Sequence, residues 1–333
     1  MKIFLAGHKG LVGSAILRKL KKKGYKKIIT ADKKKLNLLN QQEVFKFLKK
    51  NKPQIVIIAA ARVGGIHANS VYGGDFIYEN LQIQNNLIHS SYLNGVKNLI
   101  FLGSSCIYPK FSKQPIKEDY LLSGKLEESN EPYAIAKIAG IKMCEAYNKQ
   151  YKTNYKCLMP ANTYGPNDTY DLMNSHFFPA LIHKAHLCKS NKKNFLEVWG
   201  SGQPFRELIY VDDVADACIF FMNKKIKDTL INIGTGKDMK IKEYAKFIIE
   251  KLKLSVKIKF KPSKPDGMKR KVLDISRAKK YGWVSKTSLD DGFDQTYQQF
   301  LKKKKILDEK YSCCNWRCRF CRNKLNRIVY KKN

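Results

Sequence analysis

The chain has 333 residues, which is enough for one large domain or two smaller ones with an ample core. Hydrophobic residues make up 44% and aromatic residues 11% of it, a composition that excludes an intrinsically disordered protein. No apolar run approaches the roughly 20 residues that a membrane-spanning helix needs. The longest clean stretch is 55–61, so we expect a globular protein without a membrane partner.

The net charge of +36 comes mostly from lysines that are spread along the whole chain. Nucleic-acid readers concentrate arginine on one face or helix, interleaved with aromatic residues, so we expect no nucleic-acid partner. A positive field of this kind still favours an anionic nucleotide substrate. The N-terminus runs directly into a short apolar segment and a glycine loop, which is not the pattern of a signal peptide and predicts a cytoplasmic location.

Short apolar runs alternate with segments of helical periodicity in the first half of the chain. Strands are expected at 3–6, 27–31, 54–60, 98–103 and 155–159, and helices at 14–23, 43–50, 76–93 and 132–151. Because the links are short, this alternation predicts an α/β fold with a doubly wound, Rossmann-like parallel sheet.

The same pattern predicts how the chain is divided. We expect a dinucleotide-binding domain at 1–166 and a smaller, mainly substrate-binding α/β region at 167–301, with 230–234 as a segment that could return to the main sheet. The lysine run 302–305 predicts the end of the folded body. The segment 302–333 is then a basic, Cys-rich tail that we expect to be disordered.

A glycine motif stands between the first expected strand and the first expected helix. Gly7 allows a tight turn, Gly10 lets backbone N–H groups approach a pyrophosphate, and Gly13 allows close packing of helix and strand. A structural turn is the alternative, but the position favours dinucleotide binding. The predicted cofactor contacts of the motif are Gly7, His8, Lys9, Gly10, Leu11, Val12 and Gly13.

The second expected strand carries two conflicting signals about the cofactor. Asp32 lies 19 residues after Gly13, where a carboxylate could hold the ribose 2′-hydroxyl of NAD(H). Lys9 and Lys33 could instead bind a 2′-phosphate. The two cations outweigh the one carboxylate and favour NADP(H).

A tyrosine and a lysine share one face of the helix expected at 132–151. Tyr133 and Lys137 stand at positions i and i+4, and a nearby ammonium group would lower the tyrosine's usual pKa of about 10. Such pairs also occur by chance on surface helices. Ser104 follows an apolar strand at its C-terminal end, where open α/β sheets bind ligands, and would hydrogen-bond the reacting oxygen beside Tyr133.

Together, the glycine motif, Ser104 and the Tyr133–Lys137 pair resemble the extended short-chain dehydrogenase/reductase family. The longer stretches 60–66, 103–109, 130–137, 174–176 and 264–267 are similar to those of members that act on GDP-linked 4-keto-6-deoxy sugars, and the resemblance covers about 1–301. It implies 3,5-epimerisation of GDP-4-keto-6-deoxy-D-mannose and then NADPH-dependent reduction at C4. It also implies a homodimer that pairs through the helix carrying Tyr133 and its neighbour.

The resemblance assigns roles to individual residues. Cys106 and His176 are the acid and base of the epimerisation, with the order left open, and a lone cysteine or histidine would otherwise indicate packing or a solvated loop. Tyr133 gives the proton in the reduction, supported by Ser104 and Lys137. Further cofactor contacts are Lys33, Leu102, Gly103, Lys137, Pro160, Ala161, Asn162, Thr163 and His176. The substrate contacts are Lys184, Trp199, Arg206 and Asp266.

Two alternatives stay open at this point. One is a single-function reductase or epimerase acting on another nucleotide sugar, and the other is a cofactor-bound regulatory protein without turnover. Lys33 and Lys184 stand where relatives often have arginine, and lysine keeps the charge but loses the bidentate fork.

The tail carries a cysteine motif outside the resemblance. Cys314, Cys318 and Cys321 have the Cys-x3-Cys-x2-Cys spacing of an iron–sulfur cluster loop. Only twelve residues follow, far fewer than the barrel of such enzymes needs, so we expect no metal site and a remnant without function. Adventitious zinc binding is the alternative.

Overall fold

The computed structural model describes residues 1–172, 175–264 and 266–317. Asn174, Pro265, Cys318 and Cys321, which the sequence patterns include, lie outside these ranges. Strands and helices follow one another in the order that the sequence predicts over the first half of the chain.

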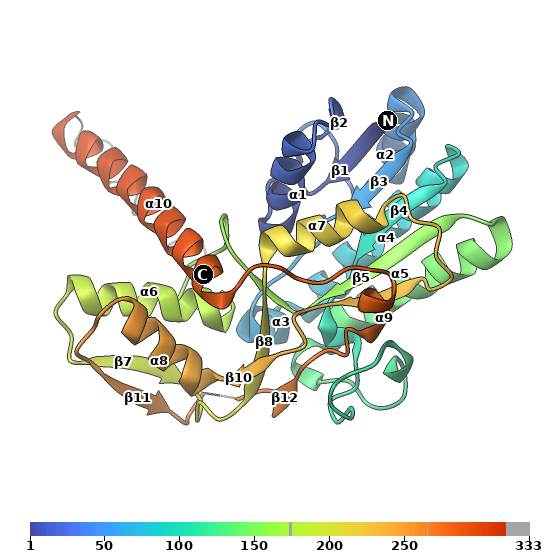
Figure 1. The fold of residues 1–333 in the computed structure, drawn as a ribbon. Helices are drawn as coiled ribbons and strands as arrows, with labels where there is room; N and C mark the ends of the chain where they lie inside the picture. Colours follow the sequence, from blue (N-terminus) through green and yellow to red (C-terminus); the bar gives the residue numbers. More distant parts are fainter. Residues whose placement is uncertain (173–174, 265, 318–333) are drawn as a thin grey trace.

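A six-stranded parallel sheet forms the centre of the larger lobe (Figure 1). Its strands are β1 (Lys2–Ala6), β2 (Lys27–Ile29), β3 (Ile55–Ile58), β4 (Asn98–Leu102), β5 (Asn154–Pro160) and β9 (Leu230–Ile233). They are ordered β2-β1-β3-β4-β5-β9, and each neighbouring pair is parallel. The chain leaves β1 towards one edge for β2 and returns to the other side for β3. This reversal creates the crevice at the carboxyl ends of the strands where doubly wound folds bind nucleotides.

Helices cover both faces of this sheet because each presents an apolar stripe to it. One face carries α1 (Leu11–Lys22) against α7 (Val211–Phe221), and the other carries α2 (Gln41–Asn51), α4 (Gly73–Leu93) and α5 (Glu131–Tyr151). In α1 the buried residues Ala15, Ile16 and Leu20 form the stripe. The short helix α3 (Ile66–Val71) and the 3₁₀ turns η1 (Ser105–Ile107), η2 (Glu118–Tyr120) and η3 (Glu128–Asn130) lie in the connections.

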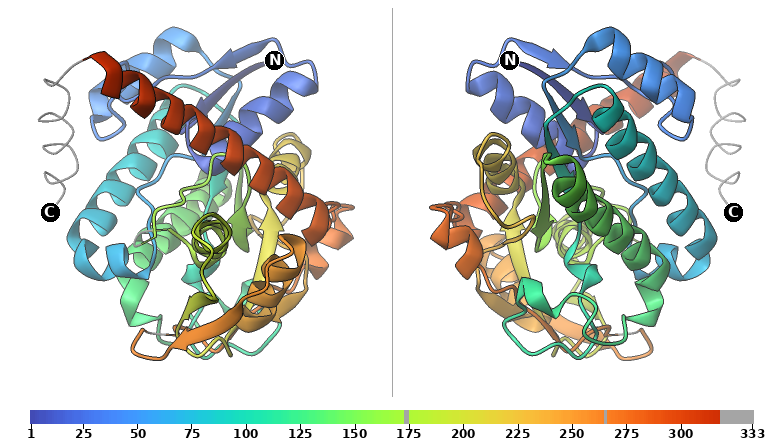
Figure 2. Two further views of the ribbon diagram at one scale, coloured as in Figure 1. Left: turned by 90° about the vertical axis from the view of Figure 1, so that its left-hand side faces the viewer. Right: turned by 90° about the vertical axis from the view of Figure 1, so that its right-hand side faces the viewer.

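The smaller lobe is built around two short sheets. Strand β8 (Phe205–Tyr210) pairs with β6 (Asn162–Tyr164), β10 (Asp238–Lys240) and β12 (Arg270–Lys271), while β7 (Phe195–Trp199) pairs with β11 (Lys257–Lys261). Helices α6 (Phe177–Ser190), α8 (Ile241–Lys251) and the start of α10 (Leu289–Arg317) enclose a second apolar core, and α9 (Ser276–Lys280) packs on β9. Figure 2 shows this lobe below the main sheet.

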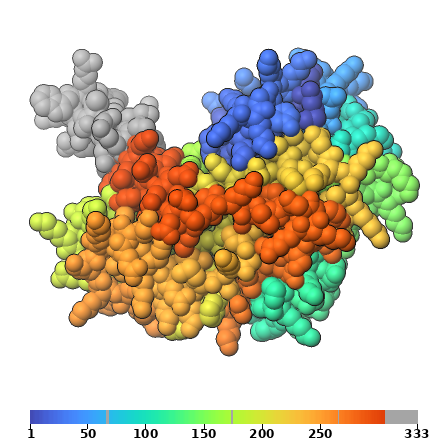
Figure 3. All heavy atoms as spheres, viewed as in Figure 1, coloured from blue at the N-terminus to red at the C-terminus, as the bar shows by residue number. Residues whose placement is uncertain are grey.

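The two lobes are connected by several chain crossings. After β8 the chain returns to the main sheet as α7 and β9, then goes back to the smaller lobe as β10 and α8. Figure 3 shows the orange and red C-terminal segments extending across the front of the molecule beneath the blue N-terminal ones.

The last helix differs from the expectation that the lysine run 302–305 ends the folded body. Helix α10 continues through that run to Arg317. Lysine is a good helix former, so a run of lysines does not interrupt a helix that has already begun. Within the described residues, no helix is long and apolar enough to cross a membrane.

Candidate active site

The turn between β1 and α1 forms a cradle that requires glycine at positions 7 and 13. Gly7 has φ +86°, and its carbonyl accepts a hydrogen bond from Gly10 N at 3.1 Å. A Cβ on Gly13 would lie 2.0 Å from Gly7 O, whereas one on Gly10 would meet only that oxygen, at 3.6 Å. The first N–H groups of α1 have no side-chain cap, so the turn fits the pyrophosphate of a dinucleotide.

The conflicting charges beside this cradle are in direct contact. Lys9 Nζ lies 3.3 Å from Asp32 Oδ2, and Lys35 N donates to Asp32 Oδ1 at 3.2 Å. The hydrogen bond from Lys9 lowers the pKa of the Asp32 carboxyl. Lys33 lies exposed in the same turn. Asp32, which could favour NAD(H), therefore lies beside Lys9 and Lys33, which could favour NADP(H).

Tyr133 lies in the first turn of α5, opposite Ser104 at the end of β4. The Ser104 hydroxyl hydrogen-bonds the Tyr133 hydroxyl, yet burial dominates and raises the pKa of Tyr133. Lys137 Nζ donates to Leu102 O at 2.9 Å and lies 5.8 Å from the centre of the Tyr133 ring. Burial lowers the pKa of Lys137 to about 8. In this structure burial outweighs the lowering of the tyrosine pKa that the sequence pattern predicts.

Cys106 and His176 come from different lobes and meet near the same lysine. Cys106 lies in η1 and His176 caps the N-terminus of α6. Lys271 Nζ, on β12, lies 3.7 Å from Cys106 Sγ. Burial lowers the pKa of His176, and the charge of Lys271 lowers it further. Sequence reasoning missed Lys271, because the basic run 269–271 has the appearance of a solvated surface.

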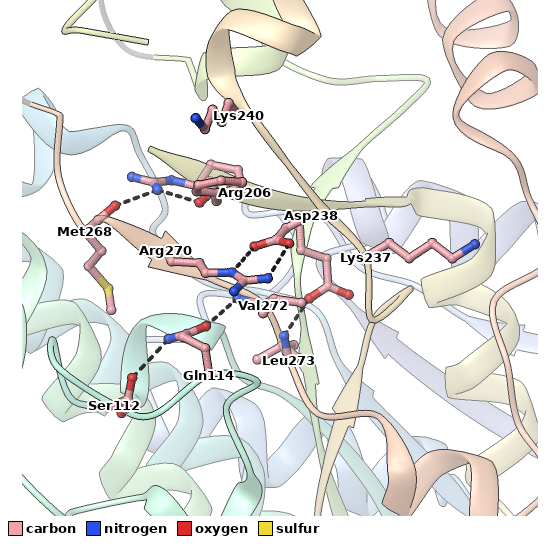
Figure 4. Close-up of polar contacts among 12 residues, drawn as sticks. Ser112, Gln114, Arg206, Lys237, Asp238, Lys240, Met268, Arg270, Val272 and Leu273 are labelled. Carbon is pink, nitrogen blue, oxygen red and sulfur yellow. Dashed lines mark hydrogen bonds and ion pairs between the residues drawn. The ribbon is translucent and has the colours of Figure 1, made fainter. Parts of the chain in front are cut away.

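The neighbours of Lys271 fix the strand that carries it. Arg270 donates to both carboxylate oxygens of Asp238 at 2.7 and 3.0 Å, and Val272 N donates to Gln114 Oε1 at 2.9 Å (Figure 4). Leu273 N donates to Glu207 Oε2 at 2.7 Å. Since the residues on both sides of Lys271 are tied to other elements, its ammonium group is directed inward and is buried.

A cavity of about 480 Å³ brings most of the predicted residues together. We call the part of the cavity lined by Ser104, Cys106, Tyr133 and His176 its inner end, and the part lined by Lys184, Trp199, Arg206 and Asp266 its outer end. Lys264, which belongs to the stretch 264–267, and Lys271, which the sequence did not single out, also line it. The cavity therefore combines acid–base groups at one end with cations and an indole at the other.

The outer end contains a loop held in place by Arg206. The Arg206 guanidinium donates to Met268 O at 2.6 Å and to Asp266 O at 3.0 Å. Figure 4 shows the contact with Met268. The Asp266 carboxylate accepts hydrogen bonds from Ser201 N and Ser201 Oγ, both at 2.7 Å. These contacts fasten 266–268, which form part of the cavity lining.

An indole and two ammonium groups form the adjoining wall. Lys184 and Lys264 place Nζ 4.6 and 4.9 Å from the centre of the Trp199 ring. Glu197 Oε1 accepts the Trp199 indole N–H at 3.0 Å and lies 3.3 Å from Lys184 Nζ. Trp199 is thus a wall of the cavity, not a core residue. Glu197 was missed because its role appears only when β7 and α6 are placed side by side.

Comparison with known proteins identifies the family. Residues 3–234 match the model of the NAD dependent epimerase/dehydratase family. The chain belongs to this family. The predicted membership of the extended dehydrogenase/reductases and the predicted fold class are therefore confirmed.

Individual members of the epimerase/dehydratase family are closely similar over nearly the whole chain. GDP-L-fucose synthase 1 of Arabidopsis thaliana is 50% identical over 301 residues, which cover 90% of this chain and 93% of that protein. GDP-L-fucose synthase of Escherichia coli is 46% identical over 310 residues, covering 90% and 97%. The structure of a GDP-mannoheptose C4 reductase from Campylobacter jejuni with NADP bound is 38% identical, with a TM-score of 0.81 and coverage of 90% and 98%.

The remaining predicted cofactor contacts lie at the carboxyl edge of the family's main sheet. His8 is in the glycine turn, Leu11 and Val12 begin α1, and Leu102 ends β4. Gly103 N donates to Leu158 O at 3.0 Å. The run from Pro160 and Ala161 to Asn162 and Thr163 connects β5 with β6, and of these four Asn162 lines the cavity. Their contacts with a cofactor stay a prediction.

Proposed function

We propose that this family member converts GDP-4-keto-6-deoxy-D-mannose into GDP-L-fucose by 3,5-epimerisation followed by NADPH-dependent reduction at C4. The observation that carries the proposal is the shared cavity. Cys106 and His176, an acid–base pair, line the same inner end as Ser104 and Tyr133, a proton-donating pair. The similarity to GDP-L-fucose synthases at 46–50% identity supports the same activity.

Epimerisation needs a base, an acid and a group that stabilises an enolate. The C4 ketone acidifies the protons on C3 and C5, and Ser104 and Tyr133 can donate hydrogen bonds to its oxygen as negative charge develops there. We assign Cys106 as the base, because the Lys271 ammonium lies 3.7 Å from Sγ and places a positive charge beside the atom that would take the proton. We assign His176 as the acid that reprotonates the opposite face, because it lines the same cavity as Cys106 but comes from the other lobe.

Reduction uses the other pair in the same cavity. NADPH supplies the hydride to C4 when bound. The raised pKa of Tyr133 keeps its hydroxyl protonated at neutral pH, which is the state needed to give a proton to the C4 oxygen. Ser104 orients that hydroxyl, and Lys137, buried behind it, is positioned to bind ribose hydroxyls.

The outer end suits the nucleotide part of the substrate. Lys184, Lys264 and Arg206 provide positive charge for a diphosphate, and Trp199 provides an apolar face for a ring. We propose that Arg206 exchanges part of its bonds to 266–268 for diphosphate oxygens. Asp266 then contributes indirectly, because its hydrogen bonds to Ser201 hold this loop in place.

We also propose a homodimer that pairs through α4 and α5. These helices pack on each other and expose the apolar side chains of Tyr78, Leu93 and Ile135. The cytoplasmic location likewise stays a prediction from the sequence.

One experiment separates this function from a single-function reductase, which the similarity to a C4 reductase favours as the second candidate. The chain is incubated with GDP-4-keto-6-deoxymannose and NADPH, and the product is identified by NMR. The proposal expects GDP-L-fucose and one NADPH oxidised per product. Cys106→Ser should slow its formation about 100-fold while NADP⁺ affinity stays unchanged. A wild-type product that keeps the original configuration at C3 and C5 would instead establish a single-function reductase.

A further inference from the structure

The end of β2 and the glycine turn place a carboxylate and an ammonium group at the point where a dinucleotide's adenosine ribose binds in doubly wound folds. Asp32 and Lys9 form this pair, with Nζ and Oδ2 3.3 Å apart. A carboxylate at this point accepts a hydrogen bond from the 2′-hydroxyl of NAD(H), whereas a cation binds the 2′-phosphate of NADP(H). The chain therefore holds both determinants, and they neutralise each other.

Asp32 is anchored independently of Lys9. Its Oδ1 accepts Lys35 N at 3.2 Å, and its carbonyl accepts the backbone N–H groups of Lys35 and Leu36 at 3.0 Å. Leu36 is buried in the main core, so this turn is fixed to the fold. The carboxylate consequently stays in place whether or not Lys9 is bound to it.

Lys9 is free to exchange partners because its side chain is mostly exposed. Its relative exposure is 71%, against 32% for Asp32. Ion pairs of this exposure contribute little stability, so a phosphate can compete for the ammonium group. Lys33 is exposed in the same turn and adds a second cation within reach of a phosphate.

We propose that the Lys9–Asp32 pair makes this enzyme bind and use both NADPH and NADH. With NADP(H), Lys9 leaves Asp32 and binds the 2′-phosphate together with Lys33, while the anchored carboxylate repels the phosphate and limits the affinity. With NAD(H), Lys9 remains paired and Asp32 accepts the 2′-hydroxyl. Asp32 is thus the residue that keeps the preference for NADPH low. This inference extends the proposed reductase function.

Calorimetric titration of the full chain with NADP⁺ and with NAD⁺, without sugar substrate, tests the inference. The wild type should bind both, with Kd values within about 100-fold of each other. Asp32→Asn keeps the side-chain acceptor for Lys35 N but removes the charge. It should tighten NADP⁺ binding and weaken NAD⁺ binding, changing their ratio about tenfold or more. Asp32→Ala, which also removes the acceptor for the ribose, should weaken NAD⁺ binding further.

Lys9→Met should weaken NADP⁺ binding about tenfold and leave NAD⁺ binding within about twofold. Lys22→Met, an exposed change of equal charge in the last turn of α1, is the matched control and should change neither constant. An unchanged NADP⁺/NAD⁺ ratio in Asp32→Asn, or wild-type NAD⁺ binding too weak to measure at millimolar concentration, would overturn the inference.

The proposed function is tested separately. Adding GDP-4-keto-6-deoxymannose with NADPH or NADH measures turnover, and the inference expects both cofactors to be oxidised. If the binding constants follow the pattern above but neither cofactor is consumed, the proposed function fails while the role of Asp32 stands.

Discussion

Lys271 Nζ lies 3.7 Å from Cys106 Sγ, although 165 residues separate them in the chain. Cys106 follows β4 of the main sheet, and Lys271 belongs to β12 of the smaller lobe. The ammonium group is buried and also lowers the pKa of His176. One cation therefore contacts the thiol of one proposed acid–base residue and favours the release of a proton from the other.

Replacing Lys271 should affect epimerisation selectively. Lys271→Met removes the positive charge beside Cys106 Sγ, so we expect deuterium exchange at the sugar to slow about 100-fold. Because Lys271 lies on β12 and takes no part in the glycine turn, NADP⁺ affinity should stay within about twofold. Exchange is measured by NMR in deuterated water, and affinity by calorimetry.

Lys269→Met is the matched control, since Lys269 is exposed two residues away and carries the same charge. Its exchange rate should equal that of the wild type. If Lys271→Met exchanges as fast as Lys269→Met, Lys271 does not act on the thiol.

The ammonium group of Lys184 should contribute to substrate binding but not to chemistry. It stacks on Trp199 and pairs with Glu197 at the outer end of the cavity. Lys184→Met should raise KM for the GDP-sugar about tenfold, with kcat changed less than about threefold. Lys184→Arg should lower KM, because the guanidinium fork can bind two diphosphate oxygens.

Steady-state kinetics with the keto-sugar measure both constants. Lys189→Met, an exposed change in the last turn of the same helix, should leave them unaltered. A fall in kcat without a change in KM for Lys184→Met would place Lys184 in the chemistry instead.

Gly13→Ala should destroy the cofactor cradle. The added Cβ would lie 2.0 Å from Gly7 O, which is backbone and cannot move without opening the turn. We expect a loss of about 2–4 kcal/mol of unfolding free energy and at least tenfold weaker NADP⁺ binding. Gly74→Ala is the control in α4, where an added Cβ meets no atom of the described residues within 4 Å. Equal urea midpoints for the two variants would argue against the tight contact.

Asp168 should make stability depend on pH. It is 5% exposed, its Oδ2 has no hydrogen-bond partner among the residues that the structure describes, and burial raises its pKa to about 7. The native state therefore binds a proton that the unfolded state releases near pH 4, so this group's contribution to stability falls as pH rises from about 4 to 7.

Asp168→Asn removes that dependence and keeps an acceptor for Thr169 N. Compared with the wild type, the variant should gain about 1–3 kcal/mol at pH 8 and much less at pH 5. Urea unfolding at the two values measures the difference. A variant that is less stable than the wild type at pH 8 would show that the buried carboxylate is stabilised by contacts beyond the Thr169 hydrogen bond.

The main sheet was largely predictable because its strands are buried on both faces and appear as apolar runs. The strand expected at 98–103 is observed as Asn98–Leu102, and the helix expected at 132–151 as Glu131–Tyr151. The strands of the smaller lobe could not be predicted. Segments such as β10 and β12 have only two or three residues and exist through pairing with β8, a contact distant in sequence.

The residues of the candidate site were likewise predictable only in part. Ser104 and Tyr133 could be selected from the sequence by their position and spacing, and Cys106 and His176 by the family resemblance. All four line one cavity. Lys271 could not, because a buried lysine looks the same in sequence as an exposed one. The burial of Tyr133 could likewise not be predicted, because it depends on the packing of α5 against the main sheet.

The central claim is that one cavity both epimerises and reduces, and incorporation of deuterium tests it most directly. The chain is incubated with GDP-4-keto-6-deoxymannose and NADPH in deuterated water, and the product is analysed by NMR. We expect one NADPH oxidised per product, deuterium at C3 and C5, and inverted configuration at both carbons. NADPH oxidation that gives a product without deuterium at C3 and C5 would contradict the epimerase role of Cys106 and His176, and no NADPH oxidation at all would contradict the reductase role of Tyr133.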